Sequence, residues 1–313
     1  MEAASTDVKN DVLKAEKEMR GHGAVANSTV EGKRTANRKL IYIGIVILVI
    51  MAGVAFSYLN GEPTYSALAE FDNSPVNATV LSQLSNIANN ATLAAKVGVG
   101  LVSSSPVRAG SNLTPLTFNG TPAIVYIGAE FCPYCAVTRW GVVLALMRFG
   151  TFTSLHYMTS SASDVYASSP TFTFYNSTYS SNVVSLVSVE ETTNQPANYS
   201  SGLDGYEVLQ TPTAFENQLF NQVDLNNPNE PDKGGIPFID FGNISVQGGA
   251  PIDPQVVYQH TWQGVIANLT DVNTTQSLSI IGAANVFTAQ ICAMTHDKPA
   301  NVCDAPYLKS IAV

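Results

Sequence analysis

An apolar run that leads into a Cys-x-x-Cys pair and then into a helical pattern dominates the sequence between Ala123 and Phe149. Residues 123–127 are almost continuously apolar, which is typical of a strand buried on both faces. From Pro133 onward the apolar side chains recur at helical spacing, and a proline is well tolerated in a first helical turn. The pattern therefore predicts that a strand turns into a helix at Cys132.

The predicted position of Cys132 determines its chemistry. Unpaired N–H groups and the positive end of the helix dipole stabilise a thiolate, the form of cysteine that attacks disulfides. Cys135 follows one helical turn later, so we predict Cys132 as the nucleophile and Cys135 as the resolving thiol. Half of a zinc site is the alternative, but no second close ligand pair accompanies the motif. We therefore expect no metal and no cofactor other than the Cys132–Cys135 disulfide.

Two motifs resemble those of the thioredoxin superfamily. AEFCPYC, residues 129–135, is similar to its active-site segment, and Pro133–Tyr134 resembles the dipeptide of glutaredoxins. GIPFIDFGN, residues 235–243, resembles the segment in which thioredoxins, glutaredoxins and periplasmic disulfide oxidases carry a cis-proline before a hairpin. The resemblance implies an α/β, thioredoxin-like fold, in which the Pro133–Tyr134 dipeptide contacts substrate.

In that superfamily the cis-proline faces the cysteine pair, and the residue before it binds the substrate backbone. Carried over to this sequence, Pro237 becomes the cis-proline and Ile236 the substrate contact; an ordinary trans loop proline is the alternative. The superfamily also carries a buried acid six residues before the first cysteine, and that position is Tyr126 here. We therefore expect proton transfer to differ and to involve Glu130, Tyr126 or water.

A membrane helix is predicted over residues 40–59, twenty residues without a charge. At 1.5 Å per residue such a helix spans a hydrocarbon core of about 30 Å. A cleaved signal peptide is the alternative, but the run is longer than a typical h-region and begins far from the N-terminus. Lys33, Arg34, Arg38 and Lys39 precede the span, so the N-terminus is expected in the cytoplasm and the rest of the chain outside it.

The charge balance differs on the two sides of this span. Residues 1–39 carry eight Lys or Arg and six Asp or Glu, as expected for a disordered cytoplasmic tail. The later residues carry seven basic and eighteen acidic side chains, which argues against a nucleic-acid partner. Nine of ten N-x-S/T sequons follow the span, consistent with an exported glycoprotein: Asn77, Asn90, Asn112, Asn119, Asn176, Asn198, Asn243, Asn268 and Asn273.

The remaining chain divides around the two motifs. Residues 60–115 are expected to form a spacer and a packing helix over 78–96, and residues 116–313 a thioredoxin-like domain. By analogy with the superfamily, 151–158 forms the next strand, parallel to the first. Residues 160–225 are expected to form a β-rich insertion, an ordered hairpin with a hydrated surface, that ends in a short helix over 213–223. Two C-terminal helices are predicted over 254–269 and 275–295.

A second cysteine pair, Cys292 and Cys303, closes a twelve-residue loop near the end of the chain. In an oxidising compartment this spacing predicts a structural disulfide, worth roughly 3 kcal/mol by the loop-entropy model. Metal ligation with His296 and a second redox pair that passes electrons to Cys132 and Cys135 are the alternatives.

Taken as a whole, the chain resembles a family of uncharacterised membrane-anchored proteins from archaea: a basic tail, one span, CPYC, IPFIDFGN and a C-terminal cysteine pair. The sequence predicts a membrane-anchored, extracytoplasmic thiol–disulfide oxidoreductase, an oxidase or isomerase of cysteine-containing exported proteins. Such an enzyme requires a membrane partner that resets its redox state. The alternative is a non-catalytic surface or envelope-binding module that keeps the Cys-x-x-Cys as a structural disulfide.

Overall fold

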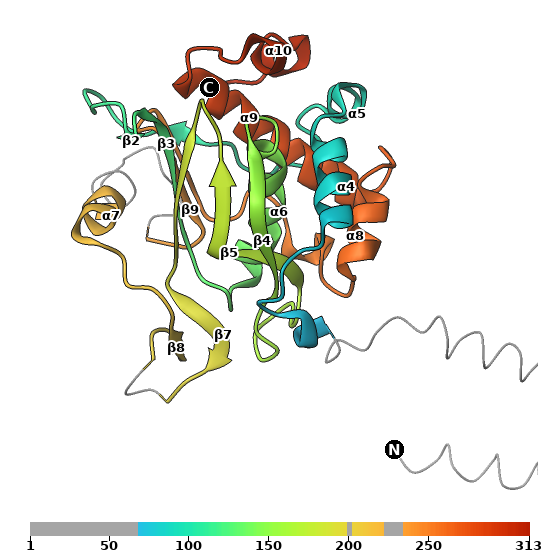
Figure 1. Cartoon of the computed structure of the whole chain (residues 1–313), viewed down its shortest axis with the longest axis vertical. Coiled ribbons are helices and arrows are strands. Elements are labelled where there is room, and N and C mark those ends of the chain that lie inside the picture. The colour runs from blue at the N-terminus through green and yellow to red at the C-terminus, as the bar shows by residue number, and fades with distance from the viewer. Residues whose placement is uncertain (1–67, 199–201, 222–233) are drawn as a thin grey trace, which may run out of the picture. The chain divides into compact units, whose positions relative to one another are not determined.

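The structure is a computed structural model, and it describes residues 68–198, 202–221 and 234–313. The predicted cytoplasmic tail and the predicted transmembrane helix over 40–59 lie outside the described residues. Among the described helices, one stretch, Ser277–Met294, is long and apolar enough to cross a membrane, and most of it is buried within the domain. Helices and strands are mixed along the chain, which confirms the predicted α/β class (Figure 1).

A mixed sheet forms the centre of the domain and carries β3, the strand that leads to Cys132. Its order is β1-β10-β9-β3-β2, and β6 pairs with β3 as well. β6 is parallel to β3, whereas β9 is antiparallel to it. The strands are β1 (Val107–Arg108), β2 (Thr117–Phe118), β3 (Thr121–Gly128), β6 (Ser185–Glu190), β9 (Phe238–Phe241) and β10 (Ser245–Gly248).

β3 is buried on both faces, as its apolar sequence predicts. Ile124 and Tyr126 point into the larger apolar core, which they share with helix residues such as Trp140. Val125 and Ile127 point into a smaller core on the opposite face of the sheet. The alternation follows from the two-residue period of a strand. Burial on both faces fixes the end of β3, and with it the position of the cysteine pair.

The helix after β3 is α6 (Pro133–Leu146), which packs against α9 (Gly282–Met294). A Cβ atom at Gly141 would lie 3.0 Å from the Cβ of Ala283, so a glycine is needed for this close approach. The other helical segments are η1 (Ala69–Phe71), α4 (Ala78–Ala88), α5 (Ala91–Val97), α7 (Ala214–Leu219), η3 (Pro254–Val256), α8 (Trp262–Asn268), η4 (Ser277–Ile281), α10 (Ala300–Cys303) and α11 (Pro306–Lys309).

Two of the predicted strands lie in other positions of the sheets than expected. The strand expected over 151–158 is β4 (Thr151–Thr159), but it is not parallel to β3; it pairs antiparallel with β5 (Pro170–Ser180) in a separate sheet. β6, which the sequence assigned to the insertion, is the parallel neighbour of β3. The physical reason is burial. The first half of β4 alternates between exposed and buried positions, whereas every residue of β6 is at least partly buried.

The predicted insertion of 160–225 is therefore not one hairpin. β5 pairs with β4, β6 belongs to the central sheet, and only β7 (Thr192–Pro196) and β8 (Tyr206–Val208) form a small antiparallel sheet of their own. The prediction that this region is rich in strands is confirmed. Its division into core and insertion is wrong, because pairing partners far apart in the sequence decide it.

Side-chain caps explain where the helices differ from the predicted ones. The helix expected over 78–96 is two helices, because the side chain of Asn90 accepts a hydrogen bond from the Leu93 N–H and starts α5. Asn77 caps α4 as predicted. The helix expected over 254–269 is interrupted, since Thr261 caps the start of α8. The helix expected over 275–295 is continuous and begins with the π-helical turn η4.

Cys292 and Cys303 form the predicted disulfide, with a Cα–Cα distance of 5.5 Å. This disulfide lies at the opposite end of the sheet from Cys132. Met294, at the end of α9, contacts Gly242 in the β9–β10 turn, where Phe241 pairs with the first half of β3. Cys132 instead follows the far end of β3, so the length of a strand separates the two cysteine pairs, about 20 Å at 3.3 Å per residue. Direct exchange of electrons between the pairs is therefore ruled out in this arrangement. No cluster of metal-ligating side chains is found over the described residues.

Candidate active site

Cys132 occupies the N-cap position of α6. Its Sγ accepts a hydrogen bond from the backbone N–H of Cys135 at 3.2 Å, and Pro133 fills the first helical position. Both cysteines are free thiols here, and their exposure differs: Cys132 is 5% exposed and Cys135 is 0% exposed. Only Cys132 reaches the surface, so a substrate sulfur can approach Cys132 and not Cys135. This is the arrangement that the sequence predicts for a nucleophile and a resolving thiol.

The two thiols differ in acidity. A hydrogen bond from the Cys135 side chain lowers the pKa of Cys132, helped by the backbone N–H of Cys135 and the charge of Arg139, although burial opposes them. Burial raises the pKa of Cys135 well above its usual value, and so does its hydrogen bond to Cys132. When the reduced pair loses one proton, Cys132 therefore loses it and Cys135 keeps its own.

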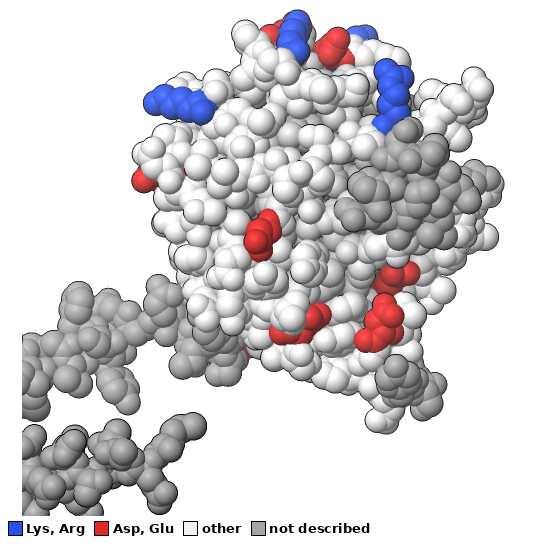
Figure 2. All heavy atoms as spheres, turned by 180° about the vertical axis from the view of Figure 1, so that it is seen from behind, with Lys and Arg blue, Asp and Glu red and all other residues white. Residues whose placement is uncertain are grey.

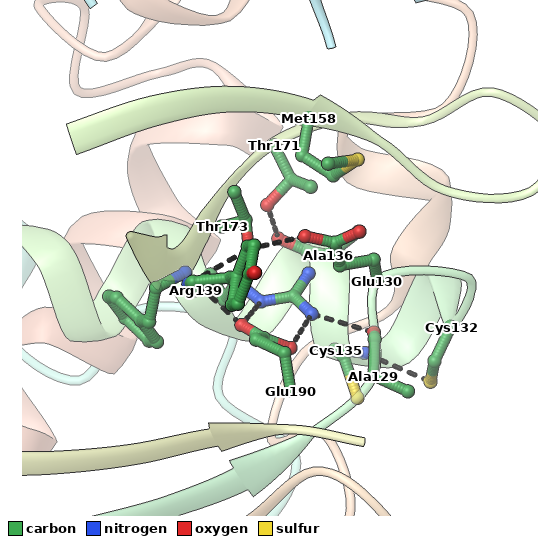
Figure 3. A network of polar contacts seen from close by, with 12 residues as sticks. Ala129, Glu130, Cys132, Cys135, Ala136, Arg139, Met158, Thr171, Thr173 and Glu190 are labelled. Atoms are coloured by element: carbon green, nitrogen blue, oxygen red, sulfur yellow. Dashed lines mark hydrogen bonds and ion pairs between the residues drawn. The ribbon is translucent and has the colours of Figure 1, made fainter. Parts of the chain in front are cut away.

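A buried ion pair lies directly beneath the cysteines (Figure 3). Arg139 Nε donates to Glu190 at 2.9 Å, and Arg139 Nη2 donates to Glu190 at 2.6 Å and to the Ala129 carbonyl at 2.6 Å. Both side chains are 0% exposed. Arg139 is on α6, four residues after Cys135, and Glu190 is the last residue of β6. The pair therefore joins the active-site helix to the neighbouring strand and holds a positive charge below the thiols.

The ion pair has further buried neighbours. Glu190 also accepts the Phe174 N–H at 3.2 Å, and the Arg139 guanidinium carbon lies 5.8 Å from the centre of the Tyr126 ring. Arg139 Nη1 is buried without a hydrogen-bond partner. We did not predict this pair from the sequence. The signal for it was there: Arg139 is the only charged residue in the fourteen-residue helix α6, and a lone charge on an apolar helix needs a buried partner.

The Ile236–Pro237 peptide bond is cis, which confirms the prediction made from the GIPFIDFGN segment. Pro237 is buried, and the next residue, Phe238, pairs with Ile127 at the end of β3. Ile236 packs against the small apolar cluster that contains both cysteines. The structure thus brings the two sequence motifs together, although a hundred residues separate them.

Of the two residues proposed for proton transfer, Glu130 points away from the cysteine cluster, and Tyr126 has a buried hydroxyl. Glu130 accepts a hydrogen bond from the Thr173 hydroxyl at 2.7 Å and faces a polar cavity of about 280 Å³ lined also by Asp72, His156 and Asn194. Figure 3 shows its carboxyl turned away from Cys132. The Tyr126 hydroxyl is buried without a partner, and burial raises its pKa well above 10. Glu130 bonds to Thr173 instead of a cysteine, and Tyr126, although close enough for its pKa to be raised by the charges of both thiols, makes no hydrogen bond to either.

Two buried carboxyls, Glu130 and Asp240, and the partly buried carboxyl of Asp72 make the stability of the domain depend on pH. Burial raises the pKa of Asp72 to about 6 and the pKa values of Glu130 and Asp240 to about 7. A folded-state pKa above the unfolded value gives stability that is complete below about pH 4 and is lost as the pH rises through 6 to 7.

We therefore expect the free energy of unfolding to fall between pH 4 and pH 8, at up to about 1.4 kcal/mol per pH unit for each carboxyl. Urea denaturation across this range measures the slope. Asp240→Asn should flatten it, since the amide keeps the hydrogen bond from the Asn243 N–H without the charge. A wild-type stability that rises with pH would contradict the assignment.

A family model described as Domain of unknown function (DUF929) matches residues 109–293. The chain belongs to the DUF929 family. The matched residues include Cys132, Cys135, the Arg139–Glu190 pair and the Ile236–Pro237 bond, so the whole site lies within the DUF929 domain. No curated protein and no solved structure matches the chain. The DUF929 description names no activity, and the function has to be argued from the site.

Proposed function

We propose that this DUF929 chain is a membrane-anchored thiol–disulfide oxidoreductase that acts outside the cytoplasm. The observation that carries the proposal is the state of Cys132: its sulfur lies at the start of a helix, accepts the Cys135 N–H and has a lowered pKa. A stabilised thiolate is both the attacking and the leaving group of disulfide exchange. The packing of Ile236 against the cysteine cluster adds a substrate-facing segment at the same place.

The proposed reaction consists of two exchanges. A substrate thiolate attacks Cys132 Sγ in the Cys132–Cys135 disulfide; a bond forms between these sulfurs, the Sγ–Sγ bond breaks, and Cys135 leaves and takes up a proton. A second substrate thiolate then attacks the substrate sulfur of the mixed disulfide and releases Cys132 as a thiolate. The substrate loses two electrons as its two thiols become a disulfide, and the cysteine pair gains them. Isomerase or reductase use needs the same residues.

The arrangement of helices and strands supports a thioredoxin-like fold. β3, α6 and the parallel strand β6 form a strand–helix–strand unit, with β4 and β5 between α6 and β6. The β9–β10 hairpin follows the cis bond and pairs antiparallel with β3. The predicted N-terminal span, the sequons and the Cys292–Cys303 disulfide support an anchored domain in an oxidising compartment. Exported proteins that contain cysteine are its proposed substrates, and a membrane redox partner is proposed to restore its disulfide.

One observation favours a different function. Cys132 is only 5% exposed, which a non-catalytic surface module with a structural Cys-x-x-Cys would also show. The two proposals differ in whether the pair reacts with an external thiol.

Stoichiometric exchange tests the proposed function. The full chain, oxidised and freed of oxidant, is mixed with a peptide that carries two cysteines. We expect one peptide disulfide to form for each chain, and mass spectrometry to find new thiols at Cys132 and Cys135 while the Cys292–Cys303 disulfide stays intact. A chain in which both Cys132 and Cys135 are replaced by Ser is the control and should leave the peptide reduced. A wild-type chain that behaves like this control would favour the structural module.

A further inference from the structure

Aromatic side chains flank Cys132 on the side of Tyr134. This ring lies between the two cysteines in the sequence and is 44% exposed. It meets the Tyr166 ring edge to face at 6.4 Å between centroids, and Tyr166 meets Tyr258 in the same way at 5.6 Å. Tyr166 and Tyr258 are partly exposed, so the three rings form a continuous aromatic surface that begins at the cysteine pair.

A second aromatic contact is made by Phe131, which packs against the apolar cluster of the two cysteines. Phe131 stacks on Tyr206 of β8, with ring centroids 4.1 Å apart and an interplanar angle of 10°. Both rings are partly exposed. β7 and β8 thus supply a ring to the redox site. From the sequence we expect the exposed tyrosines of residues 160–205 to form a hydrated surface, and contact with a polypeptide substrate is the alternative.

Carboxylates accompany both aromatic groups. Asp253 forms a hydrogen bond with Tyr166 and raises its pKa. Near the second aromatic contact, the Glu191 N–H donates to the carbonyl of Gly128 at the end of β3. Burial raises the pKa of Glu191, and the charge of nearby Asp204 adds to this effect. We call the following set the redox face: Phe131, Tyr134, Tyr166, Tyr206, Tyr258, Glu191, Asp204 and Asp253.

The basic side chains lie elsewhere. Among the described residues, the Lys and Arg that are not buried are Lys96, Arg108, Lys298 and Lys309. Arg108 pairs with Ser245 beside the β9–β10 turn, and the other three lie around the C-terminal disulfide and α5, at the end of the sheet opposite Cys132. Figure 2 shows the same segregation: blue side chains occur only near the upper end of the visible face, and the lower half carries red ones. Among the described residues, the redox face thus combines exposed rings with carboxylates and has no exposed Lys or Arg.

We propose that the redox face binds extended polypeptide segments in which Lys or Arg lies a few residues from the reacting cysteine. The inference rests on the proposed disulfide exchange and names its substrate class. The carboxylates attract the basic segment, and the rings of Tyr134, Tyr166 and Tyr206 offer flat surfaces to its cationic side chains. Acidic segments are repelled by the same charges.

Exchange rates with three thiols test this proposal. Two peptides each carry one cysteine and either two Lys or two Glu. One charged residue lies four residues before the cysteine and the other four residues after it, so that the charges change the pKa of the thiol little. β-Mercaptoethanol is the uncharged reference. At pH 7 and low salt we expect the oxidised full chain to react about tenfold faster with the Lys peptide than with the Glu peptide. The ratio should approach one in 1 M salt, which screens the charges.

Paired variants locate the charges responsible. Asp204→Asn with Asp253→Asn should reduce the ratio several-fold, because two carboxylates of the redox face are neutralised. Asn suits both positions, since Asp204 has a φ of 54° and an amide oxygen can still accept the hydrogen bonds that Asp253 accepts from the Gln255 N–H and from Tyr166. Asp297→Asn with Asp304→Asn removes the same charge at the opposite end and should leave the ratio unchanged. Equal rates for the two peptides, with normal reaction of β-mercaptoethanol, would overturn the inference and leave the exchange function standing. No reaction with any thiol would refute the function itself.

Discussion

Replacing Arg139 by Met, or Glu190 by Gln, should lower the free energy of unfolding by about 3–5 kcal/mol, because each change leaves one buried charge without its partner. The two side chains are 0% exposed and share two hydrogen bonds, at 2.6 Å and 2.9 Å. Desolvation of the remaining charge is then uncompensated. Denaturant unfolding of the full chain measures the loss.

Two further variants separate this effect from general damage. Arg139→Met combined with Glu190→Met removes both charges and should recover much of the stability, since replacing a buried pair with apolar side chains is often close to neutral. Lys309→Met breaks the exposed pair with Asp304, in which the side chains are 56% and 60% exposed, and should leave the unfolding midpoint unchanged. If the double variant were as unstable as the sum of the single ones, the pairing would not be the cause.

The single substitutions Arg139→Met and Glu190→Gln also have a chemical readout. Arg139 is one of the groups that lower the pKa of Cys132, so Arg139→Met should shift alkylation of Cys132 to higher pH. Glu190→Gln frees the guanidinium of its counter-charge and should shift alkylation to lower pH. Shifts in opposite directions from two destabilising variants cannot come from loss of stability alone, and iodoacetamide labelling at graded pH measures both.

Local signals made part of the site predictable. The helix that begins at Cys132, the proline in its first turn and the buried strand before it are properties of one contiguous segment. The Cys292–Cys303 disulfide also follows from spacing and compartment. The cis bond at Pro237 was found through a motif, and the β9–β10 hairpin follows from residues next to each other in the chain.

The parts that were missed depend on partners far apart in the sequence. Glu190 lies 51 residues after Arg139, and nothing in either segment alone indicates that they meet. From the sequence we predict β4 as the parallel neighbour of β3, but β6 has that position; both segments mix polar and apolar residues, so neither pattern alone indicates which one pairs with β3. The rings that flank Cys132 come from Tyr166, Tyr206 and Tyr258, which the chain brings together only on folding.

Trapping of mixed disulfides depends on the division of roles between the two thiols. In Cys135→Ser, the sulfur of Cys132 still exchanges with a substrate, but no resolving thiol can release the product. In Cys132→Ser, the remaining sulfur is 0% exposed and its pKa is raised, so it neither meets a substrate nor ionises readily. Both serines are close in size to the cysteines they replace, which makes the two variants matched controls for each other.

The decisive measurement is the yield of mixed disulfide when each single variant of the full chain is incubated with a cysteine peptide whose sulfur has been activated as a disulfide. Mass spectrometry should find the peptide attached to Cys132 in nearly every molecule of Cys135→Ser and in almost none of Cys132→Ser. Equal yields from the two variants, or no adduct with either, would contradict a reactive sulfur at the start of α6.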